Sequence, residues 1–185
     1  LQISDTTSAN IYLQTHNAGT GSTAGVYFRT SDSSTANGFF KSAVVLEDDG
    51  TSFARGKLHF LQNNTADSSN ATLDDSVVTI LQNGDVGIGT TNPFGNLHVK
   101  SGNSGASSVG ASADELVLEN SGNAGMTILS STSGEGLINF ADSGDVNVGS
   151  VVYNHTDNQL RFKTADGERL RIASSGQIGL GGANY

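Results

Sequence analysis

Apolar and polar residues alternate along short stretches of the chain, and turn-forming residues follow each stretch. The alternation is clearest in Lys57-Leu58-His59-Phe60, Gln159-Leu160-Arg161-Phe162 and Arg169-Leu170-Arg171-Ile172. A period of two places apolar side chains on one face of a β-strand and polar side chains on the other. No long stretch keeps apolar residues at the i, i+3, i+4 and i+7 spacing of a helix. The sequence therefore predicts an all-β fold of short strands and turns, with little or no helix.

The alternating segments recur in the two halves of the chain. Residues 78–89 match residues 170–181 at a constant offset of 92 (170 − 78). Upstream, Leu58-His59-Phe60 matches Leu160-Arg161-Phe162 at an offset of 102 (160 − 58), so the first copy holds ten more residues between the matching segments. These fall within the polar stretch 63–72. A polar insertion between two strands predicts an exposed loop.

This repetition predicts two tandem strand-rich modules, 1–99 and 114–185. The Ser- and Gly-rich stretch 100–113 between them has the composition of a flexible connector. Two weaker matches link Ile11-Tyr12-Leu13 with Leu116-Val117-Leu118, and Gly25–Phe28 with Gly125–Ile128.

The Asn83-Gly84 pair lies between two alternating segments, which is typical of a two-residue type I′ hairpin. Such a hairpin sets Ile80 opposite Gly87, so large residues would face glycine. One hypothesis is that glycines here mark turns or a close approach to another chain near a symmetry axis, where a side chain would not fit. The glycines concerned are Gly84, Gly87 and Gly89 in the first copy and Gly176, Gly179 and Gly181 in the second.

Composition indicates that one copy of the chain cannot easily enclose a core. Its 185 residues include 24 Gly and no Trp, and 35% are hydrophobic. Burial contributes about 25 cal/mol per Å² of apolar surface, whereas ordering each residue costs about 1–2 kcal/mol of backbone entropy. We therefore predict a homotrimer whose interior is shared between chains. The residues predicted to line it are Leu58, Phe60, Val78, Ile80, Val86, Ile88, Leu160, Phe162, Leu170, Ile172, Ile178 and Leu180.

Charge and cysteine content exclude several classes of function. Nine Lys and Arg against 18 Asp and Glu give a net charge of −9, which argues against nucleic acid as a partner. With no Cys, the chain has neither disulfides nor thiol chemistry. No stretch reaches the roughly 20 apolar residues of a membrane helix, so we expect no membrane insertion.

Two blocks of sequence resemble the stalk repeats of bacteriophage tail fibres. One runs from Asn83 through Gly87-Ile88-Gly89 to Pro93 and continues with Leu97-His98-Val99; the other extends from Gly136 to Gly181 and includes Glu168–Ile172. The resemblance implies an elongated homotrimeric fibre, a structural shaft that positions a receptor-binding tip for host attachment. It also implies an extracellular place in the virion and other tail or fibre proteins as partners.

The chain departs from this family after Gly181. In the family the glycine motif is followed by Thr/Ser-x-x-Pro and often by a self-cleaving chaperone domain, whereas this chain reads Gly182-Ala183-Asn184-Tyr185. Two alternatives stay open: a module of a bacterial extracellular filament or adhesin, and a fibre segment that binds host glycan directly. In the latter, the contacts would come from loop 63–72 or from exposed aromatic residues, namely Tyr12, Tyr27, Phe39, Phe40 and Tyr153.

Candidate chemistry in the sequence is weak, and we expect no catalytic site, cofactor or metal. Asp48-Asp49-Gly50 and Asp142–Asn147 carry clustered oxygen ligands but lack the calcium-loop pattern, and they are typical of ordinary turns. The histidines at 16, 59, 98 and 155 are dispersed. On alternating strands they are expected to point outward into solvent.

Overall fold

The structure of the chain is a computed structural model that describes residues 13–14, 19–29, 39–50 and 55–181. Within these residues the regular structure is β-strand apart from one short 3₁₀ helix, η1 (Leu73–Asp75), which confirms the predicted all-β fold. The chain divides into two compact units, Leu1–Gly125 and Met126–Tyr185. Ile11, Tyr12 and His16 lie outside the described residues.

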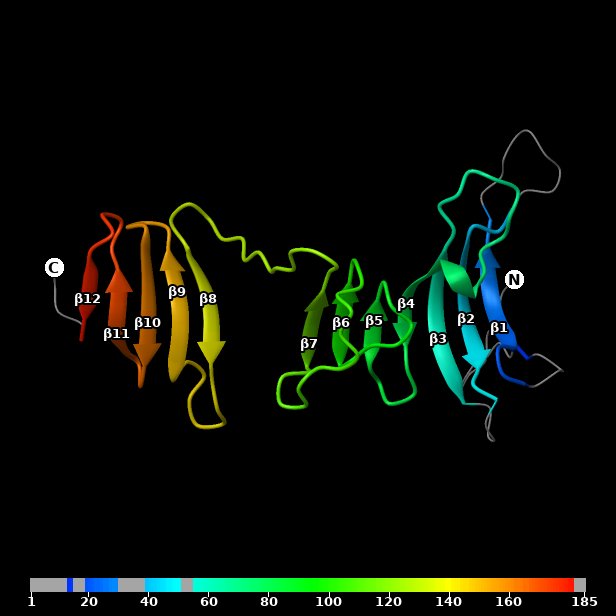
Figure 1. Cartoon of the computed structure of the whole chain (residues 1–185), viewed down its shortest axis with the longest axis horizontal. Coiled ribbons are helices and arrows are strands. Elements are labelled where there is room, and N and C mark those ends of the chain that lie inside the picture. The colour runs from blue at the N-terminus through cyan, green and yellow to red at the C-terminus, as the bar shows by residue number, and fades with distance from the viewer. Residues whose placement is uncertain (1–12, 15–18, 30–38, 51–54, 182–185) are drawn as a thin grey trace, which may run out of the picture. The chain divides into compact units, whose positions relative to one another are not determined.

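The first unit is a single seven-stranded sheet whose strands follow one another in chain order (Figure 1). The first five strands form an antiparallel meander, and the last two are added in parallel. Its strands are β1 (Thr23–Phe28), β2 (Ser42–Asp48), β3 (Gly56–Gln62), β4 (Ser76–Ile80), β5 (Val86–Ile88), β6 (Leu97–Lys100) and β7 (Leu116–Glu119).

The second unit is a five-stranded antiparallel meander, again with neighbours in chain order. Its strands are β8 (Glu135–Phe140), β9 (Gly149–Asn154), β10 (Gln159–Thr164), β11 (Gly167–Ile172) and β12 (Ile178–Leu180). Each strand of β8–β12 thus has a counterpart in β1–β5.

The repeat read from the sequence is also a repeat of strand register. Val78 pairs with Ile88 in the first unit, and Leu170 pairs with Leu180 in the second, at the same offset of 92. The weaker match of Gly25–Phe28 with Gly125–Ile128 does not correspond to structure, because β1 is the counterpart of β8 and residues 125–128 lie outside any strand.

The boundary between the two units falls later in the chain than the predicted start of the second module at residue 114. β7 lies after that position, yet it pairs in parallel with β6, from Leu97↔Leu116 to Lys100↔Glu119. Backbone pairing therefore keeps residues 116–119 in the first sheet, and the division falls between Gly125 and Met126.

The hairpin register predicted around Asn83-Gly84 is wrong by one residue. Ile80 pairs with Val86, and Gly87 pairs with Thr79, so large residues face large residues. The Leu81 N–H donates to Asp85 O (2.9 Å) and Gly84 has a φ of +93°, which is a three-residue loop with glycine at its left-handed position. The second copy repeats this loop, with Gly176 at a φ of +84°.

Gly87 and Gly89 therefore have a cause within their own chain. A Cβ on Gly87 would lie 2.2 Å from the Thr90 carbonyl oxygen, and a Cβ on Gly89 would lie 2.2 Å from that of Lys100. The tight approach that excludes a side chain is to the start of the β5–β6 connection at Gly87 and to the end of β6 at Gly89. In the second copy, Gly179 is buried on β12, and Gly181 has a φ of +75° with open space around it.

We expect Gly87→Ala to destabilise the fold by about 1–3 kcal/mol, because the new methyl group meets a backbone oxygen that cannot rotate away. Gly122→Ala is the matched control, since its Cβ would meet no atom within 4 Å. Urea unfolding at one protein concentration measures both. Equal stability of the two variants would contradict this reading of the β5–β6 turn.

Candidate assembly face

One face of the first sheet is apolar across all seven strands. Residues that pair directly across strands share a face, and following the pairs from β1 to β7 gives two rows, which together we call the first stripe. One row is Val26, Val44, Phe60, Val78, Ile88, Val99 and Leu118. The other is Ala24, Leu46, Leu58, Ile80, Val86, Leu97 and Leu116.

The second sheet carries the same arrangement, which we call the second stripe. Its first row is Ile138, Val151, Phe162, Leu170 and Leu180. Its second row is Gly136, Tyr153, Leu160, Ile172 and Ile178. The two stripes correspond strand by strand over the five strands of the repeated meander.

All twelve residues predicted to line a trimer interior lie in these stripes, six in each. Leu58, Phe60, Val78, Ile80, Val86 and Ile88 are in the first stripe, and Leu160, Phe162, Leu170, Ile172, Ile178 and Leu180 are in the second. The structure adds members that sequence reasoning missed, such as Leu97 and Val99 on β6 and Leu116 and Leu118 on β7. On β6 the alternation of Leu97-His98-Val99 was a usable signal, whereas on β7 the consecutive apolar residues 116–118 do not show which face each joins.

Neither stripe is covered within the described part of the chain. None of the twelve predicted residues is buried, and exposure reaches 64% at Ile178 and 68% at Leu180. In the first stripe, Phe60 is 39% and Ile88 42% exposed. Continuous apolar surface of this kind marks an interaction site in soluble proteins.

The opposite face of the first sheet is closed by the chain itself. Val45 and Leu61 are buried there together with Ala71, and Leu73 packs against them. Ala71 and Leu73 belong to the segment between β3 and β4, which contains the ten-residue insertion. The predicted exposed loop is therefore polar over most of its length, and its apolar end packs against Val45 and Leu61 of the sheet.

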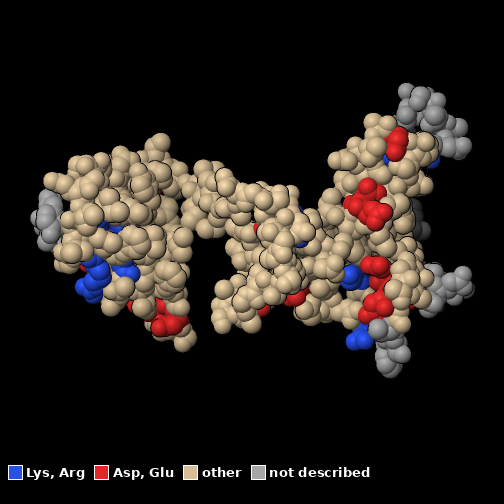
Figure 2. Space-filling view, viewed as in Figure 1, with Lys and Arg blue, Asp and Glu red and all other residues tan. Residues whose placement is uncertain are grey.

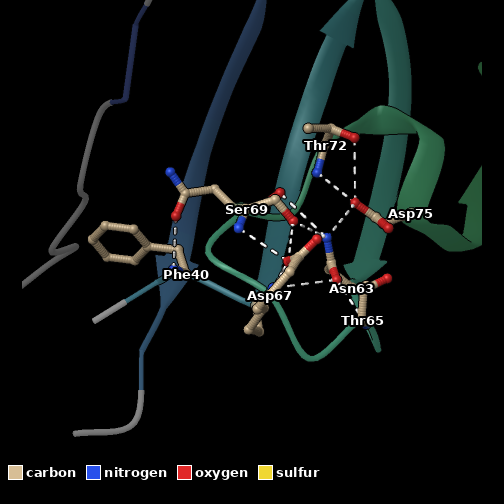
Figure 3. A network of polar contacts seen from close by, with 9 residues as sticks. Phe40, Asn63, Thr65, Asp67, Ser69, Thr72 and Asp75 are labelled. Carbon is tan, nitrogen blue, oxygen red and sulfur yellow. Dashed lines mark hydrogen bonds and ion pairs between the residues drawn. The ribbon is translucent and has the colours of Figure 1, made fainter. Parts of the chain in front are cut away.

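Polar contacts link the residues of this loop to one another (Figure 3). The Asn63 side chain is 8% exposed; its Oδ1 accepts the Thr65 N–H (2.9 Å), and its Nδ2 donates to Ser69 Oγ (3.1 Å). Asp67 accepts from Lys41 Nζ (2.8 Å) and from the Ser69 N–H (3.0 Å). The Lys41 hydrogen bond, with help from Ser69, holds the pKa of Asp67 well below its usual range.

Two histidines expected in solvent are buried on this closed face, so that expectation is wrong. His59 is 1% exposed, with Nε2 3.0 Å from Glu47 Oε2 and Nδ1 3.1 Å from Thr79 Oγ1. His98 is fully buried and stacks on Phe94, whose backbone N–H donates to His98 Nδ1 (3.2 Å). The His59 ring meets residues of β2 and β4, and the His98 ring meets Phe94 of the segment before β6. Alternation along a strand cannot indicate such contacts. His155 is half-buried.

Glu119 on β7 ties the loop after β6 to the sheet. Its Oε1 accepts the backbone N–H of Ser104 (2.7 Å), and its Oε2 lies 3.1 Å from Lys100 Nζ. His98 Nε2 lies 3.0 Å from the same Oε2, without the alignment of a hydrogen bond. The hydrogen bond from the Ser104 backbone and the nearby Lys100 ammonium lower the pKa of Glu119 to about 2, against the opposing effect of burial.

The opposite face of the second sheet carries mostly polar side chains, and Val152, which pairs with Arg161, is fully buried among them. β10 and β11 are joined by a two-residue turn, Ala165-Asp166, with positive φ at both residues. Arg161 pairs across strands with Arg171, which donates to Glu168 (2.7 Å) and lowers the pKa of that carboxyl. Figure 2 shows basic side chains gathered on this unit.

In the acidic turns considered as calcium sites, carboxylate oxygens accept hydrogen bonds from backbone N–H groups of the same turn. Asp48 Oδ1 accepts the Gly50 N–H (2.7 Å), and Asp142 Oδ1 accepts the Gly144 N–H (2.7 Å). Among the described residues, no group of three or more His, Asp or Glu side chains is placed to hold a metal ion. In the same residues, no helix has the length and apolar character needed to cross a membrane.

Comparison of the sequence with protein-family models gives no match, and comparison with curated proteins gives none either. The arrangement of the two stripes is therefore the main basis for a functional proposal.

We expect the Glu119 carboxylate to make the protein acid-sensitive between pH 4.5 and 2. Its pKa is lower in the folded state, about 2 against 4.5, so its contribution to stability is complete above pH 4.5 and is lost as pH falls toward 2. The melting temperature of Glu119→Gln should therefore fall less over this range than that of the wild type. Glu115→Gln, at an exposed position on the same segment, is the control. Parallel acid profiles for all three proteins would refute this role.

Proposed function

We propose that the chain is a shaft segment of a homotrimeric phage tail fibre, which holds a receptor-binding tip away from the virion for host attachment. The observation that carries the proposal is the pair of open stripes: each unit is a single sheet with an uncovered apolar face. Three copies enclose these faces together. Phage origin and the attachment role rest on the resemblance of residues 83–99 and 136–181 to tail-fibre stalk repeats.

Strand length supports three copies over other numbers. The strands have three to seven residues, and a side of five residues spans about 17 Å at about 3.4 Å per residue. Three such sides form a triangle whose centre is about 5 Å from each sheet, half of the roughly 10 Å between packed sheets. Four sides would leave the centre about 8.5 Å away and the interior hollow. Each stripe is only two rows of residues wide. In a pair of copies its two edges would therefore stay exposed to water.

The outward faces suit a fibre exposed to solvent. The first unit turns its ordered polar loop outward, and the second turns its paired arginines and carboxylates outward. A net charge of −9 per chain keeps long assemblies apart in solution. The proposal places the chain outside cells, in contact with other tail or fibre proteins, and assigns it no catalytic activity, cofactor, nucleic acid or membrane partner.

The same architecture fits a bacterial extracellular filament or adhesin. The two readings differ in genetic context, because a fibre gene lies among genes for other virion parts. Neighbouring genes for surface export with no virion genes would favour the filament.

A second candidate function is direct binding of a surface glycan by the first unit. Tyr27 and Phe40 are each more than a third exposed, with ring centroids 6.1 Å apart, and Asn70 borders the hollow beside them. Aromatic faces next to an amide suit sugar rings. Glycan-array binding by the chain that is lost in Phe40→Ala would support this function; absence of binding by the wild type would refute it.

We expect Ile172→Asp to prevent trimer formation, because an unpaired buried charge costs several kcal/mol at each of three equivalent sites. Sedimentation velocity of the purified variant measures the effect. Ser174→Asp adds the same charge at an exposed turn two residues away and should leave assembly intact. An Ile172→Asp protein that still sediments as a trimer would overturn the proposed interior.

A further inference from the structure

Residues 126–129 are the most exposed apolar segment of the described chain. Met126 is 57%, Ile128 42% and Leu129 90% exposed, although Met-Thr-Ile-Leu has the composition of a strand. The segment belongs to the second unit and follows β7 as plain trace without a strand (Figure 1).

The segment has no partner for its backbone within the described residues. No hydrogen bond joins residues 124–130 to another described residue; the nearest are those accepted by Asn123 O (3.0 Å) and Ser131 O (3.0 Å). A Cβ on Gly125 would meet open space. Met126 and Leu129 in particular remain largely open to solvent in the single chain.

Ile128 lies over the face of the second sheet that carries the second stripe. Gly136 is the first member of that stripe's second row, and a Cβ there would lie 3.7 Å from Ile128 Cγ2. Ile128 thus fills the space above the one position in the stripe that has no side chain. In an extended segment Met126 points to the same side as Ile128, and Leu129 points to the other.

We propose that residues 126–129 lie between two copies of the chain. Met126 and Ile128 continue the second stripe into the shared interior, and Leu129 packs against the neighbouring copy. A segment that is apolar on both sides needs a surface on each side, and its own unit supplies only the one beneath Ile128. A second copy is the partner because the segment is continuous with the stripe. This inference rests on the proposed trimer.

The chain contains one methionine, so oxidation of wild-type protein by dilute hydrogen peroxide reports on Met126 alone. Mass spectrometry follows the reaction in the native protein and in the urea-unfolded chain, after the native mass has been measured. We expect oxidation at least about tenfold slower in the native protein. A native trimer whose Met126 oxidises as fast as the unfolded chain would overturn this inference and leave the proposed function standing, whereas a monomeric mass would overturn both.

Leu129 is tested separately, because the chain also lacks tryptophan. Leu129→Trp, Phe162→Trp in the second stripe and Ser174→Trp in an exposed turn each give a single fluorescent reporter. In trimers of confirmed mass, acrylamide should quench Trp fluorescence in Leu129→Trp and Phe162→Trp several-fold less than in Ser174→Trp. If Leu129→Trp is quenched like Ser174→Trp while Phe162→Trp is shielded, the segment does not contact a neighbouring copy. Failure of Leu129→Trp alone to assemble would count for the contact.

Discussion

An apolar face that its own sheet cannot cover is the constraint on which this molecule depends. Each unit is one layer of short strands, and a layer with one apolar face needs a second surface before it is stable in water. Backbone pairing between neighbouring strands sets the rows of the two stripes in line, so that Phe60, Val78 and Ile88 form one continuous edge-to-edge row. The hydrogen bonds of the ladder and the burial of the stripe are therefore coupled. Strand pairing builds the surface, and in the proposed trimer association covers it.

The two units differ in what covers the face of the sheet opposite the stripe. In the first, ten additional residues bring Ala71 and Leu73 over Leu61, and buried polar side chains such as His59 and Thr79 find partners within the chain. In the second, a two-residue turn replaces the loop, and the corresponding positions carry Arg161 and Arg171, which pair with carboxylates. Val152, beside Arg161 on this face, is fully buried. The same five-strand frame thus tolerates either a sealed or an ionic outer face, while its stripe stays apolar in both copies.

Much of the fold could be predicted because alternation with a period of two along a strand determines on which face of the sheet a side chain lies. That rule placed all twelve residues predicted for a shared interior on the stripes and identified the repeat at residues 78–89 and 170–181. It did not determine register at Asn83-Gly84, since the same dipeptide also fits the last two positions of a three-residue loop, and the choice depends on the bond from Leu81 to Asp85. The burial of His98 was equally out of reach. Alternation shows that a residue leaves the stripe, but what covers the other face depends on contacts from residues distant in sequence, such as Glu119.

The molecular mass of the wild-type chain in solution tests the central claim most directly. Light scattering on a chromatographed sample, or native mass spectrometry, compares the assembly with the 19.0 kDa chain. Shared burial of the two stripes predicts a species of three chains that persists on dilution. A stable, soluble species of one chain, with its stripes open to water, would contradict the account.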